Sequence, residues 1–386
     1  MRVIVSGGGT SGHINPALTI AGKIRKEDPN AVIEYVGTEK GLETKLVPRE
    51  GYTIHYVKVE GLKRKLSAEN LRVAREAITS VREAKEILRA FRPDVVVGTG
   101  GYVCWPVLRA AAALKIPTVV HESNAVPGLA TRMLSHFVSK ILVNFKESEQ
   151  KLHVPKSRVL CVGNPVKDEM FTLKKDECRK SLGIGSDEKV LLSFGGSLGA
   201  RTVNNLMYEL IENEMLPHDV RIIHATGSGY WDKAREHFLM RGFAQTDENT
   251  LKKENITLHR YIYNMPTVMA CADVVICRSG AMTVSEIAAM GKTAIFIPSP
   301  NVTDNQQYEN AHVLEKAGAA ALLEEKDATA QRLADMAKAL LSDEKKRRAM
   351  ETKTKEFVHR TSLDEIYGVI KELAEKKNKE NQKLKV

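Results

Sequence analysis

The sequence predicts an α/β protein of two domains, each built on a doubly wound parallel sheet. The chain has 386 residues, which is too long for one ordinary hydrophobic core. Short apolar runs rich in valine and isoleucine alternate with helical patterns, as in parallel strands that are linked by helices. The pattern restarts after the turn-forming residues Gly163, Asn164 and Pro165. We therefore expect a domain boundary near Asn164.

In the first half, an apolar run at Val3 to Val5 leads through a glycine-rich turn into a helix predicted over Ala17 to Lys26. A later stretch predicts an amphipathic helix whose apolar stripe packs in the core. That stripe consists of Leu71, Ala74, Ile78, Val81, Ala84, Leu88 and Phe91. The other strands are predicted over Val32 to Val36, Ile54 to Val59, Asp94 to Gly98, Thr118 to His121, Ile141 to Phe145 and Val159 to Val162.

The second half repeats this organisation. A second glycine-rich turn follows a strand at Val190 to Phe194 and precedes a helix over Arg201 to Glu212. A last amphipathic helix is predicted over Asp364 to Ala374, and the polar run Lys376 to Val386 is predicted to be disordered. The other strands are predicted over Val220 to His224, Ile256 to Ile262, Val274 to Cys277, Ala294 to Pro298 and Ala320 to Leu323.

Composition excludes several classes of protein. The 5 cysteines include no CxxC pair and are odd in number, which indicates neither a disulfide framework nor a zinc site. No apolar stretch approaches the roughly 20 residues that span a bilayer. The charged Arg2 leads directly into a strand-like run, so we expect neither a secreted nor a transmembrane protein. The net charge of +10 suits an anionic partner, but aromatic residues make up only 5% of the chain and are not interleaved with the basic clusters. We therefore expect a reducing, cytosolic setting and no nucleic-acid partner.

The first glycine-rich turn, Gly7 to Gly12, satisfies the pattern GxGxxG between a strand and a helix. Such a turn brings backbone N–H groups and a helix N-terminus towards a phosphate. A dinucleotide site also requires an acidic residue after the second strand, and Glu39 stands there, so a dehydrogenase is one interpretation. His13 ends the turn where its side chain would face the cleft, and it is either structural or catalytic.

The second glycine-rich turn, Gly195 to Gly199, lacks the GK[ST] ending of a Walker loop but can still hold a diphosphate. Its Ser197 can cap the following helix or donate to a phosphate oxygen. The alternative is a tight strand-to-helix turn without a ligand.

A third helix start follows the strand Val274 to Cys277, at the same edge of the second sheet. Ser279 is a natural N-cap there, and Arg278 adds fixed positive charge. Glu286 lies off the apolar stripe of this helix, as a solvated carboxylate or as a ligand for two sugar hydroxyls. The loop that follows is dense in amides, which suit sugar hydroxyls because they both donate and accept. Its polar residues are Asp304, Asn305, Gln306, Gln307 and Asn310.

Polar groups also follow two strands of the first domain, at Gly98 to Tyr102 and at His121 to Asn124. They would share a sheet edge with His13 and form a polar floor that a core does not need. No DxD sequence occurs in the chain, so the usual carboxylate pair for a metal beside a nucleotide diphosphate is missing. We expect no metal or other cofactor, and helix N-termini would stabilise the leaving diphosphate instead.

The basic cluster Lys63-Arg64-Lys65 is flanked by Leu62 and Leu66. Basic residues meet anionic lipid head groups while leucines enter the interface, so this segment predicts a contact with a membrane surface. The remaining basic clusters are equally well explained as solvated helix faces.

Seven spaced motifs resemble the MurG family, the bacterial transferases of glycosyltransferase family 28 that add N-acetylglucosamine to the lipid-linked muramyl pentapeptide of peptidoglycan synthesis. The motifs are GGTSGH at Gly8 to His13, GTGGYV at Gly98 to Val103, HESN at His121 to Asn124, GNPV at Gly163 to Val166, GGSLGAR at Gly195 to Arg201, CRSGAMTVSEI at Cys277 to Ile287 and DNQQYEN at Asp304 to Asn310. The resemblance implies the GT-B fold, with two Rossmann-like domains facing a cleft. An acceptor- and membrane-facing domain would cover 1–163, joined by a C-terminal helix at 362–376, and a UDP-sugar domain would cover 164–361, before a disordered tail at 377–386.

The same resemblance implies roles for individual residues. On the second domain, the backbone of Ile262 would read uracil, Glu286 would hold the ribose hydroxyls, and Ser197 would meet the diphosphate. The other residues implied in substrate binding are Thr10, Ser11, Gly12, Asn124, Lys167, Ala281, Met282, Thr283, Val284, Ser285, Gln306 and Gln307. His13 would be the catalytic base on the acceptor side.

The implied reaction is a metal-independent displacement with inversion, which joins the sugar of UDP-N-acetylglucosamine to the polyprenyl-pyrophosphoryl-muramyl pentapeptide through a β-1,4 link. It serves cell wall biogenesis, cell shape and cell division, at the cytoplasmic side of the cell membrane as a peripheral protein. The chain departs from the family pattern at Ser123, Lys167 and Leu198, where glutamine, arginine and glutamine are usual. These departures fit a diverged second copy. A UDP-N-acetylglucosamine 2-epimerase and a binding paralogue without catalysis are the alternatives.

Overall fold

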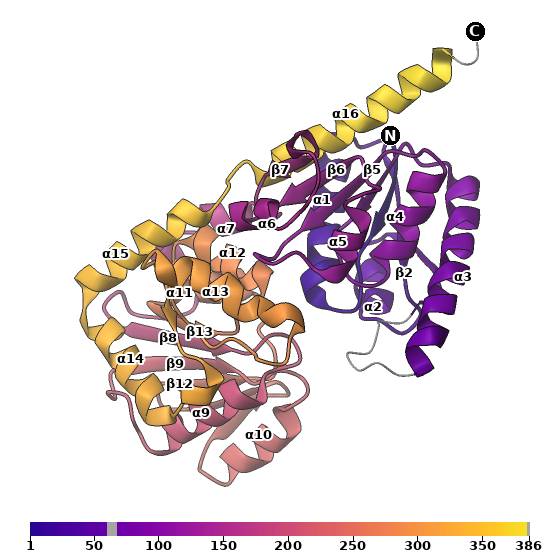
Figure 1. Cartoon of the computed structure of the whole chain (residues 1–386). Helices are drawn as coiled ribbons and strands as arrows, with labels where there is room; N and C mark the ends of the chain where they lie inside the picture. The colour runs from indigo at the N-terminus through magenta and orange to yellow at the C-terminus, as the bar shows by residue number, and fades with distance from the viewer. Residues whose placement is uncertain (60–67, 384–386) are drawn as a thin grey trace. The chain divides into compact units, whose positions relative to one another are not determined.

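The computed structural model describes residues 1–59 and 68–383, without the side chains of 68–77, 381 and 383. The chain divides into two compact units, each with its own sheet (Figure 1). Unit 1 consists of Met1–Val166 and His359–Val386, and unit 2 consists of Lys167–Val358.

Unit 1 has a seven-stranded parallel sheet in the order β3-β2-β1-β4-β5-β6-β7. Its strands are β1 (Arg2–Ser6), β2 (Val32–Gly37), β3 (Thr53–Tyr56), β4 (Val95–Gly98), β5 (Thr118–Glu122), β6 (Lys140–Val143) and β7 (Val159–Cys161). Its helices are α1 (Ser11–Glu27), α2 (Glu43–Arg49), α3 (Ala68–Phe91), α4 (Cys104–Ala113), α5 (Leu129–Leu134), α6 (Lys146–Gln150) and α16 (Ser362–Lys383), with a 3-10 turn at Lys156–Arg158.

Alternate residues of each strand in unit 1 face opposite sides of the sheet, and each side has its own core. Val3 and Val5 pack on the side covered by α1, α2 and α16, whereas Ile4 packs on the side covered by α3, α4 and α5. The strand order reverses between β1 and β4. In doubly wound sheets, ligands bind outside the carboxyl ends of the strands at such a reversal.

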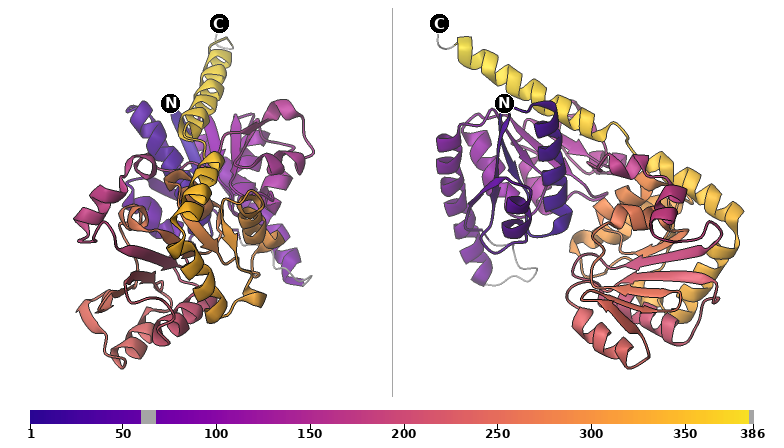
Figure 2. Two further views of the ribbon diagram at one scale, coloured as in Figure 1. Left: turned by 90° about the vertical axis from the view of Figure 1, so that its left-hand side faces the viewer. Right: turned by 180° about the vertical axis from the view of Figure 1, so that it is seen from behind.

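The last helix belongs to unit 1, although unit 2 precedes it in the chain. Ile366, Ile370 and Ala374 of α16 are buried in the same core as β1, and α16 lies against α1 (Figure 2). The helix continues to Lys383, so the prediction of a disordered tail from 377 is wrong for these residues. Lys377 Nζ donates to Pro93 O at 3.0 Å, an anchor that a polar sequence pattern does not reveal. Residues 384–386 lie outside the described residues.

Helix α3 forms where the apolar stripe predicts a helix, but the stripe is only partly buried. Ala84, Leu88 and Phe91 are buried, as predicted, whereas Ile78 is 60% exposed. At 100° per residue, Ile78 lies about 140° around the helix from Phe91, and Ser80 takes the buried position instead. The side chains of Leu71 and Ala74, and the predicted membrane contact at 62–66, lie outside the described residues.

Unit 2 has an eight-stranded sheet in the order β10-β11-β12-β9-β8-β13-β14-β15. Its strands are β8 (Lys189–Phe194), β9 (Val220–Ala225), β10 (Ala244–Asp247), β11 (Thr250–Lys253), β12 (Ile256–His259), β13 (Val274–Cys277), β14 (Thr293–Phe296) and β15 (Ala321–Leu322). Its helices are α7 (Glu169–Thr172), α8 (Lys175–Ser181), α9 (Arg201–Glu212), α10 (Trp231–Leu239), α11 (Met265–Cys271), α12 (Ala281–Met290), α13 (Gln306–Lys316), α14 (Ala330–Ser342) and α15 (Glu344–Thr354), with 3-10 turns at Thr303–Asn305, Glu325–Asp327 and Lys355–Phe357.

Strands β10, β11 and β12 form an antiparallel meander at one edge of this sheet, which the sequence did not predict. Every residue of β10 is exposed, so this strand lacks the apolar run that predicts the other strands. The strands from β12 to β15 are parallel, and the order reverses between β8 and β13. The carboxyl ends of β8 and β13 therefore form the expected ligand crevice of unit 2.

Candidate active site

In unit 1, His13 lies in the first turn of α1, at the reversal between β1 and β4. Its Nδ1 is 3.2 Å from Thr99 O, and Thr99 Oγ1 donates to His13 O at 2.7 Å. A Cβ at Gly100 would lie only 2.6 Å from the imidazole, so the turn after β4 packs directly against the ring. Thr10 precedes the helix in an extended conformation. Thr10 and Gly12 are exposed, whereas Ser11 and His13 are half-buried.

The environment of His13 favours its neutral form. Burial lowers the pKa of His13, although the Glu122 carboxylate and the hydrogen bond to Thr99 act in the opposite direction. Because a carbonyl oxygen only accepts, the contact with Thr99 O places the hydrogen on Nδ1 and leaves Nε2 as the basic nitrogen. A neutral imidazole with a basic Nε2 is able to take a proton from a hydroxyl group.

All four residues of the HESN motif are buried in unit 1. Both nitrogens of Asn124, backbone N and Nδ2, donate to the same oxygen of Glu122, at 3.0 and 2.9 Å, so this carboxylate orients the amide. His121 is fully buried with Nε2 at 2.9 Å from Gly163 O, and burial lowers its pKa. Ser123 is 2% exposed and lies 3.5 Å from His121 Nδ1. The departure at Ser123 therefore lies inside the fold.

In unit 2, the second glycine turn follows β8 at the reversal between β8 and β13. Gly199 has a φ of 89°, and a Cβ there would lie 2.1 Å from Thr226 O, so the turn rests on the backbone that follows β9. Ser197 is half-buried, and its carbonyl accepts from Ser228 N at 3.1 Å. Leu198, one of the three departures from the expected motifs, is 59% exposed.

The start of α12 lies at the same crevice, but two predicted contributions to it are wrong. Gly280 is the N-cap, and it has no side chain to satisfy the N–H groups that a helix start leaves without intrahelical partners. Ser279 Oγ instead donates to Gln307 O at 2.7 Å. Arg278 donates to Ile297 O and pairs with Glu325, so its charge is used within the fold. The first residues of α12 are those predicted, from Ala281 to Ser285, and among them Met282 and Thr283 are half-buried.

Glu286 is half-buried in α12, on a different face from the buried Val284 and Ile287, as the apolar stripe predicts. Within residues 1–59 and 68–383, no hydrogen bond or ion pair reaches its carboxylate. Burial raises the pKa of Glu286 to about 7, and the positive charge of Lys167, an exposed residue, acts against this shift. A half-buried carboxyl group with a raised pKa and no protein partner is a candidate ligand-binding group.

Two residues of the amide-rich loop, Gln306 and Gln307, are candidates for contact with the sugar. Asn310 is fully buried and its Nδ2 donates to Ser279 O at 3.2 Å, so it supports the fold. Gln307 Oε1 accepts from Ser299 N at 2.9 Å. Gln306 and Gln307 are half-buried at the start of α13, after two residues with left-handed φ. Those two residues are Asp304 and Asn305, at 51° and 50°.

Ile262 follows β12 between two exposed tyrosines, Tyr261 and Tyr263, which are 42% and 73% exposed. Its side chain is buried. In the described part of the chain, neither its backbone N–H nor its C=O has a hydrogen-bond partner. This backbone is therefore able to recognise a planar base.

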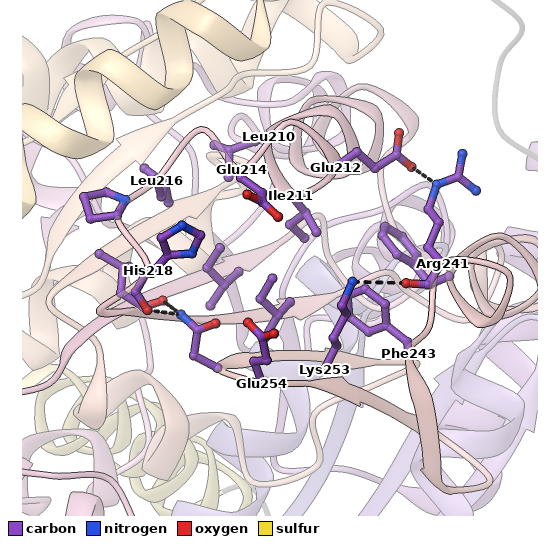
Figure 3. Close-up of a pocket in the computed structure, with 16 residues that line it drawn as sticks. Leu210, Ile211, Glu212, Glu214, Leu216, His218, Arg241, Phe243, Lys253 and Glu254 are labelled. Carbon is purple, nitrogen blue, oxygen red and sulfur yellow. Dashed lines mark hydrogen bonds and ion pairs between the residues drawn. The ribbon is translucent and has the colours of Figure 1, made fainter.

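A pocket of about 320 Å³ in unit 2 lies apart from these residues (Figure 3). It opens at the amino end of β9, where Val220 and Ile222 line it, and Glu214 and Glu254 project into it. None of the predicted site residues lines this pocket. It therefore plays no part in the candidate site.

Sequence reasoning missed Glu43, the buried carboxylate that faces the first glycine turn. The sequence pointed to Glu39, but Glu39 is exposed and Glu43 is fully buried. The only signal was a second acidic residue four positions later, and the choice between the two depends on how α2 packs.

Comparisons with known proteins identify the family of this chain. The family model described as the glycosyltransferase family 28 N-terminal domain matches residues 3–143, and the model of the C-terminal domain of that family matches residues 190–366. The chain belongs to glycosyltransferase family 28. The family that the seven motifs predict is thereby confirmed.

Relatives in family 28 match over nearly their whole length. A protein of Acetivibrio thermocellus is 42% identical over 98% of this chain and 99% of its own. It is named UDP-N-acetylglucosamine–N-acetylmuramyl-(pentapeptide) pyrophosphoryl-undecaprenol N-acetylglucosamine transferase. A Bacillus cereus protein with the same name and the suffix 1 is 39% identical over 97% of this chain and 100% of its own.

Solved structures support the predicted GT-B fold. MurG of Acinetobacter baumannii superposes with a TM-score of 0.74 at 24% identity, covering 96% of this chain and 99% of that one. A UDP-GlcNAc 2-epimerase of Neisseria meningitidis superposes with a TM-score of 0.62 at 15% identity, covering 95% of this chain and 99% of that one. The family 28 chain thus has the predicted class of two α/β domains on largely parallel sheets. Among its described residues, no helix has both the length and the apolarity needed to cross a membrane.

Proposed function

We propose that this chain transfers N-acetylglucosamine from UDP-N-acetylglucosamine to a lipid-linked muramyl pentapeptide. Relatives that carry this activity in their names match the chain almost end to end. The structural observation that carries the proposal is Glu286, a half-buried carboxylate without a protein partner, within the described residues, beside the crevice of unit 2. A carboxylate in this position is suited to accept two hydrogen bonds from a ribose.

The donor binds to unit 2 in this proposal. Its diphosphate meets Ser197 and the N-terminal end of α12, the helix end that favours negative charge. Uracil pairs with the backbone of Ile262, the ribose with Glu286, and the sugar with Gln306 and Gln307. Lys167 adds positive charge near Glu286.

The acceptor is activated by unit 1. Nε2 of His13 takes the proton from the sugar hydroxyl, whose oxygen then attacks the anomeric carbon while the bond to UDP breaks. Attack opposite the leaving group inverts the anomeric centre. Thr10, Ser11, Gly12 and Asn124 surround this step. The helix dipole and N–H groups of α12 stabilise the negative charge on the leaving UDP, and the chain has no DxD pair for a metal.

An exposed apolar surface of unit 1 supports the proposed contact with the membrane that holds a lipid-linked acceptor. Leu129, Met133 and Phe137, in α5 and the turn after it, are 45%, 42% and 48% exposed. The guanidinium of Arg109 lies over the ring of Phe137, at 4.4 Å from its centroid. Exposed apolar side chains beside cationic ones fit the interface of an anionic membrane, and we place the protein at the cytoplasmic face of the cell membrane.

A transfer assay tests the function. Purified protein, labelled UDP-N-acetylglucosamine and a muramyl-pentapeptide-pyrophosphoryl-polyprenol should give a labelled disaccharide lipid in the presence of a metal chelator. No transfer to this acceptor would contradict the proposal. Acceptor-free conversion of the UDP-sugar would instead indicate the 2-epimerase, and binding without turnover would indicate a non-catalytic paralogue.

A further inference from the structure

Glu43 is a fully buried carboxylate that lies against the first glycine turn. It begins α2 and is 0% exposed. Oε1 accepts from the backbone N of Thr38 at 3.1 Å and from Thr38 Oγ1 at 2.7 Å. Oε2 accepts from Gly9 N at 3.4 Å. One carboxylate therefore links the end of β2 to the turn that leads into α1.

The glycines around Glu43 leave space for its side chain. A Cβ at Gly8 would lie 2.7 Å from Oε1, and a Cβ at Gly37 would lie 2.7 Å from Cγ. At Gly41 it would lie 1.9 Å from Oε2. Gly8 and Gly41 lie in turns, and Gly37 ends β2. None of these three positions has room for a side chain while Glu43 occupies this space.

The turn is thus filled from inside the protein. In a dinucleotide site, N–H groups of such a turn point at a phosphate. Here the N–H of Gly9 points at a protein carboxylate, and Tyr35 Oη donates to Gly7 O at 2.5 Å. Glu43 supplies from the fold the negative charge that a phosphate supplies elsewhere.

The fixed turn determines where His13 lies. His13 N donates to Thr10 O at 3.0 Å, so the ring follows the path of the turn through Gly9 and Thr10. A Cβ at Gly7 would lie 2.7 Å from His13 O, which shows how closely the two ends of the turn approach. A shift of Gly9 would therefore move the start of α1 and the imidazole with it.

We propose that Glu43 is a positioning residue of the transferase, an internal anion that sets the first glycine turn and thereby places His13 against the acceptor hydroxyl. The proposal rests on the proposed role of His13. It gives the first glycine turn a different function from the second, because the first is closed by a protein carboxylate.

The first test compares three variants of the full chain. Glu43→Gln keeps the shape but places an amide NH₂ against one of the N–H donors, so kcat should fall about 10-fold with the Michaelis constant for UDP-N-acetylglucosamine within twofold. Thr38→Val removes one donor to Oε1 and should lower kcat about threefold. Glu39→Gln, an exposed carboxylate nearby, is the control and should match the wild type. An unchanged kcat in both Glu43→Gln and Thr38→Val would overturn the proposal.

The second test asks whether Glu43 acts through His13. On the positioning account, adding Glu43→Gln to His13→Ala lowers kcat no further, because the base is already gone. A fully additive loss would mean that Glu43 acts separately, and the proposal fails while the transferase function stands. If Glu43→Gln does not fold, Thr38→Val in the His13→Ala background decides the same question.

A third measurement needs no activity. In Glu43→Gln the two donors of Thr38 hold the single amide oxygen, so Gly9 N–H loses its acceptor. Deuterium exchange of the amides in the peptide from Gly7 to His13 should therefore be faster in Glu43→Gln than in Glu39→Gln. Unchanged exchange would contradict the contact itself. If the wild type transfers no sugar, this measurement still tests the anchored turn separately from the proposed function.

Discussion

Burial shifts the pKa of His13 downwards and that of Glu286 upwards, because a low-dielectric environment disfavours the charged form of each group. The lowered pKa favours the proposed role of His13, whereas the raised pKa works against the proposed role of Glu286. A neutral His13 is ready to take a proton, whereas Glu286 is ready to accept ribose hydroxyls only once it has ionised. The pH dependence of the two steps should therefore differ.

Replacement of His13 should affect chemistry more than donor binding. His13→Ala should lower kcat by about 10² or more, the usual range for loss of a general base, with donor affinity nearly unchanged. The wild-type kcat should fall only at a pH below the ordinary pKa of 6.5, since the pKa of His13 is lowered. Steady-state kinetics at several pH values measure both. A large loss of UDP-sugar binding would instead make His13 structural.

Replacement of Glu286 should chiefly weaken donor binding. Glu286→Gln loses charge-assisted hydrogen bonds, which are worth about 1.5–3 kcal/mol, and the Michaelis constant for the UDP-sugar should rise about 10- to 100-fold. In the wild type this constant should fall as pH rises from 6 to 8, because the carboxyl group ionises through a pKa of about 7. The constant of the variant should not follow pH in this way. A pH-independent constant in the wild type would count against the ribose contact.

The same carboxyl group also makes stability depend on pH. Its folded pKa of about 7 exceeds the ordinary 4.5, so between these values the folded state keeps a proton that the unfolded state has lost. This group's contribution to stability is therefore fully present below 4.5, falls as pH rises, and is lost once pH has passed through about 7. Thermal melts should show Glu286→Gln gaining stability relative to wild type from pH 5 to pH 8. A constant difference across this range would contradict the raised pKa.

Each of the two sheets reverses its strand order at one place, and a glycine turn follows the central strand there. The second turn rests on backbone rather than on a side chain. A Cβ at Gly227 would lie 2.1 Å from Gly199 N. The turns after β8 and β9 can therefore pack this closely only with glycine at both positions. In the same pair of turns, Ser228 N donates to Ser197 O at 3.1 Å.

Gly199→Ala should therefore damage both stability and donor binding. Its Cβ would lie 2.1 Å from Thr226 O, and backbone cannot move aside as a flexible side chain does. Gly183 is the matched control, because it has a φ of 64° and a Cβ there would meet no atom within 4 Å. Gly183→Ala should cost only about 1–2 kcal/mol for the left-handed conformation and leave the donor constant unchanged. Thermal melts and donor titration of both variants measure the difference, and equal effects would contradict the role of the contact.

Unit 1 is assembled from two separate segments of the chain. Helix α16 buries Ile366, Ile370 and Ala374 in the core that β1 and α1 also form. Lys23 Nζ is 2.6 Å from Asp364, and the free energy of such a partly exposed pair is small, so the apolar stripe holds the helix.

Ile370→Ala should destabilise unit 1 by about 2–5 kcal/mol, because Ile370 is 0% exposed and truncation of its side chain leaves a cavity in the core. Ile78→Ala is the control, since Ile78 is 60% exposed and loses little contact. Denaturant unfolding monitored by exchange of amides in β1 and β4 reports on unit 1 directly. Similar stabilities of the two variants would show that α16 contributes little to this core.

Sequence patterns alone predict the fold class, the parallel strands, the helix over Arg201–Glu212 and the motifs around His13 and Glu286. These features depend on local periodicity and on glycines at strand ends, which short stretches of sequence carry. Which polar groups form hydrogen bonds inside the fold depends instead on tertiary packing. Ser279, Arg278 and Asn310 form contacts with residues distant in the sequence, and Glu43 rather than Glu39 faces the first turn. A hydrogen bond depends on distances that packing sets, and residue type alone does not fix its partner.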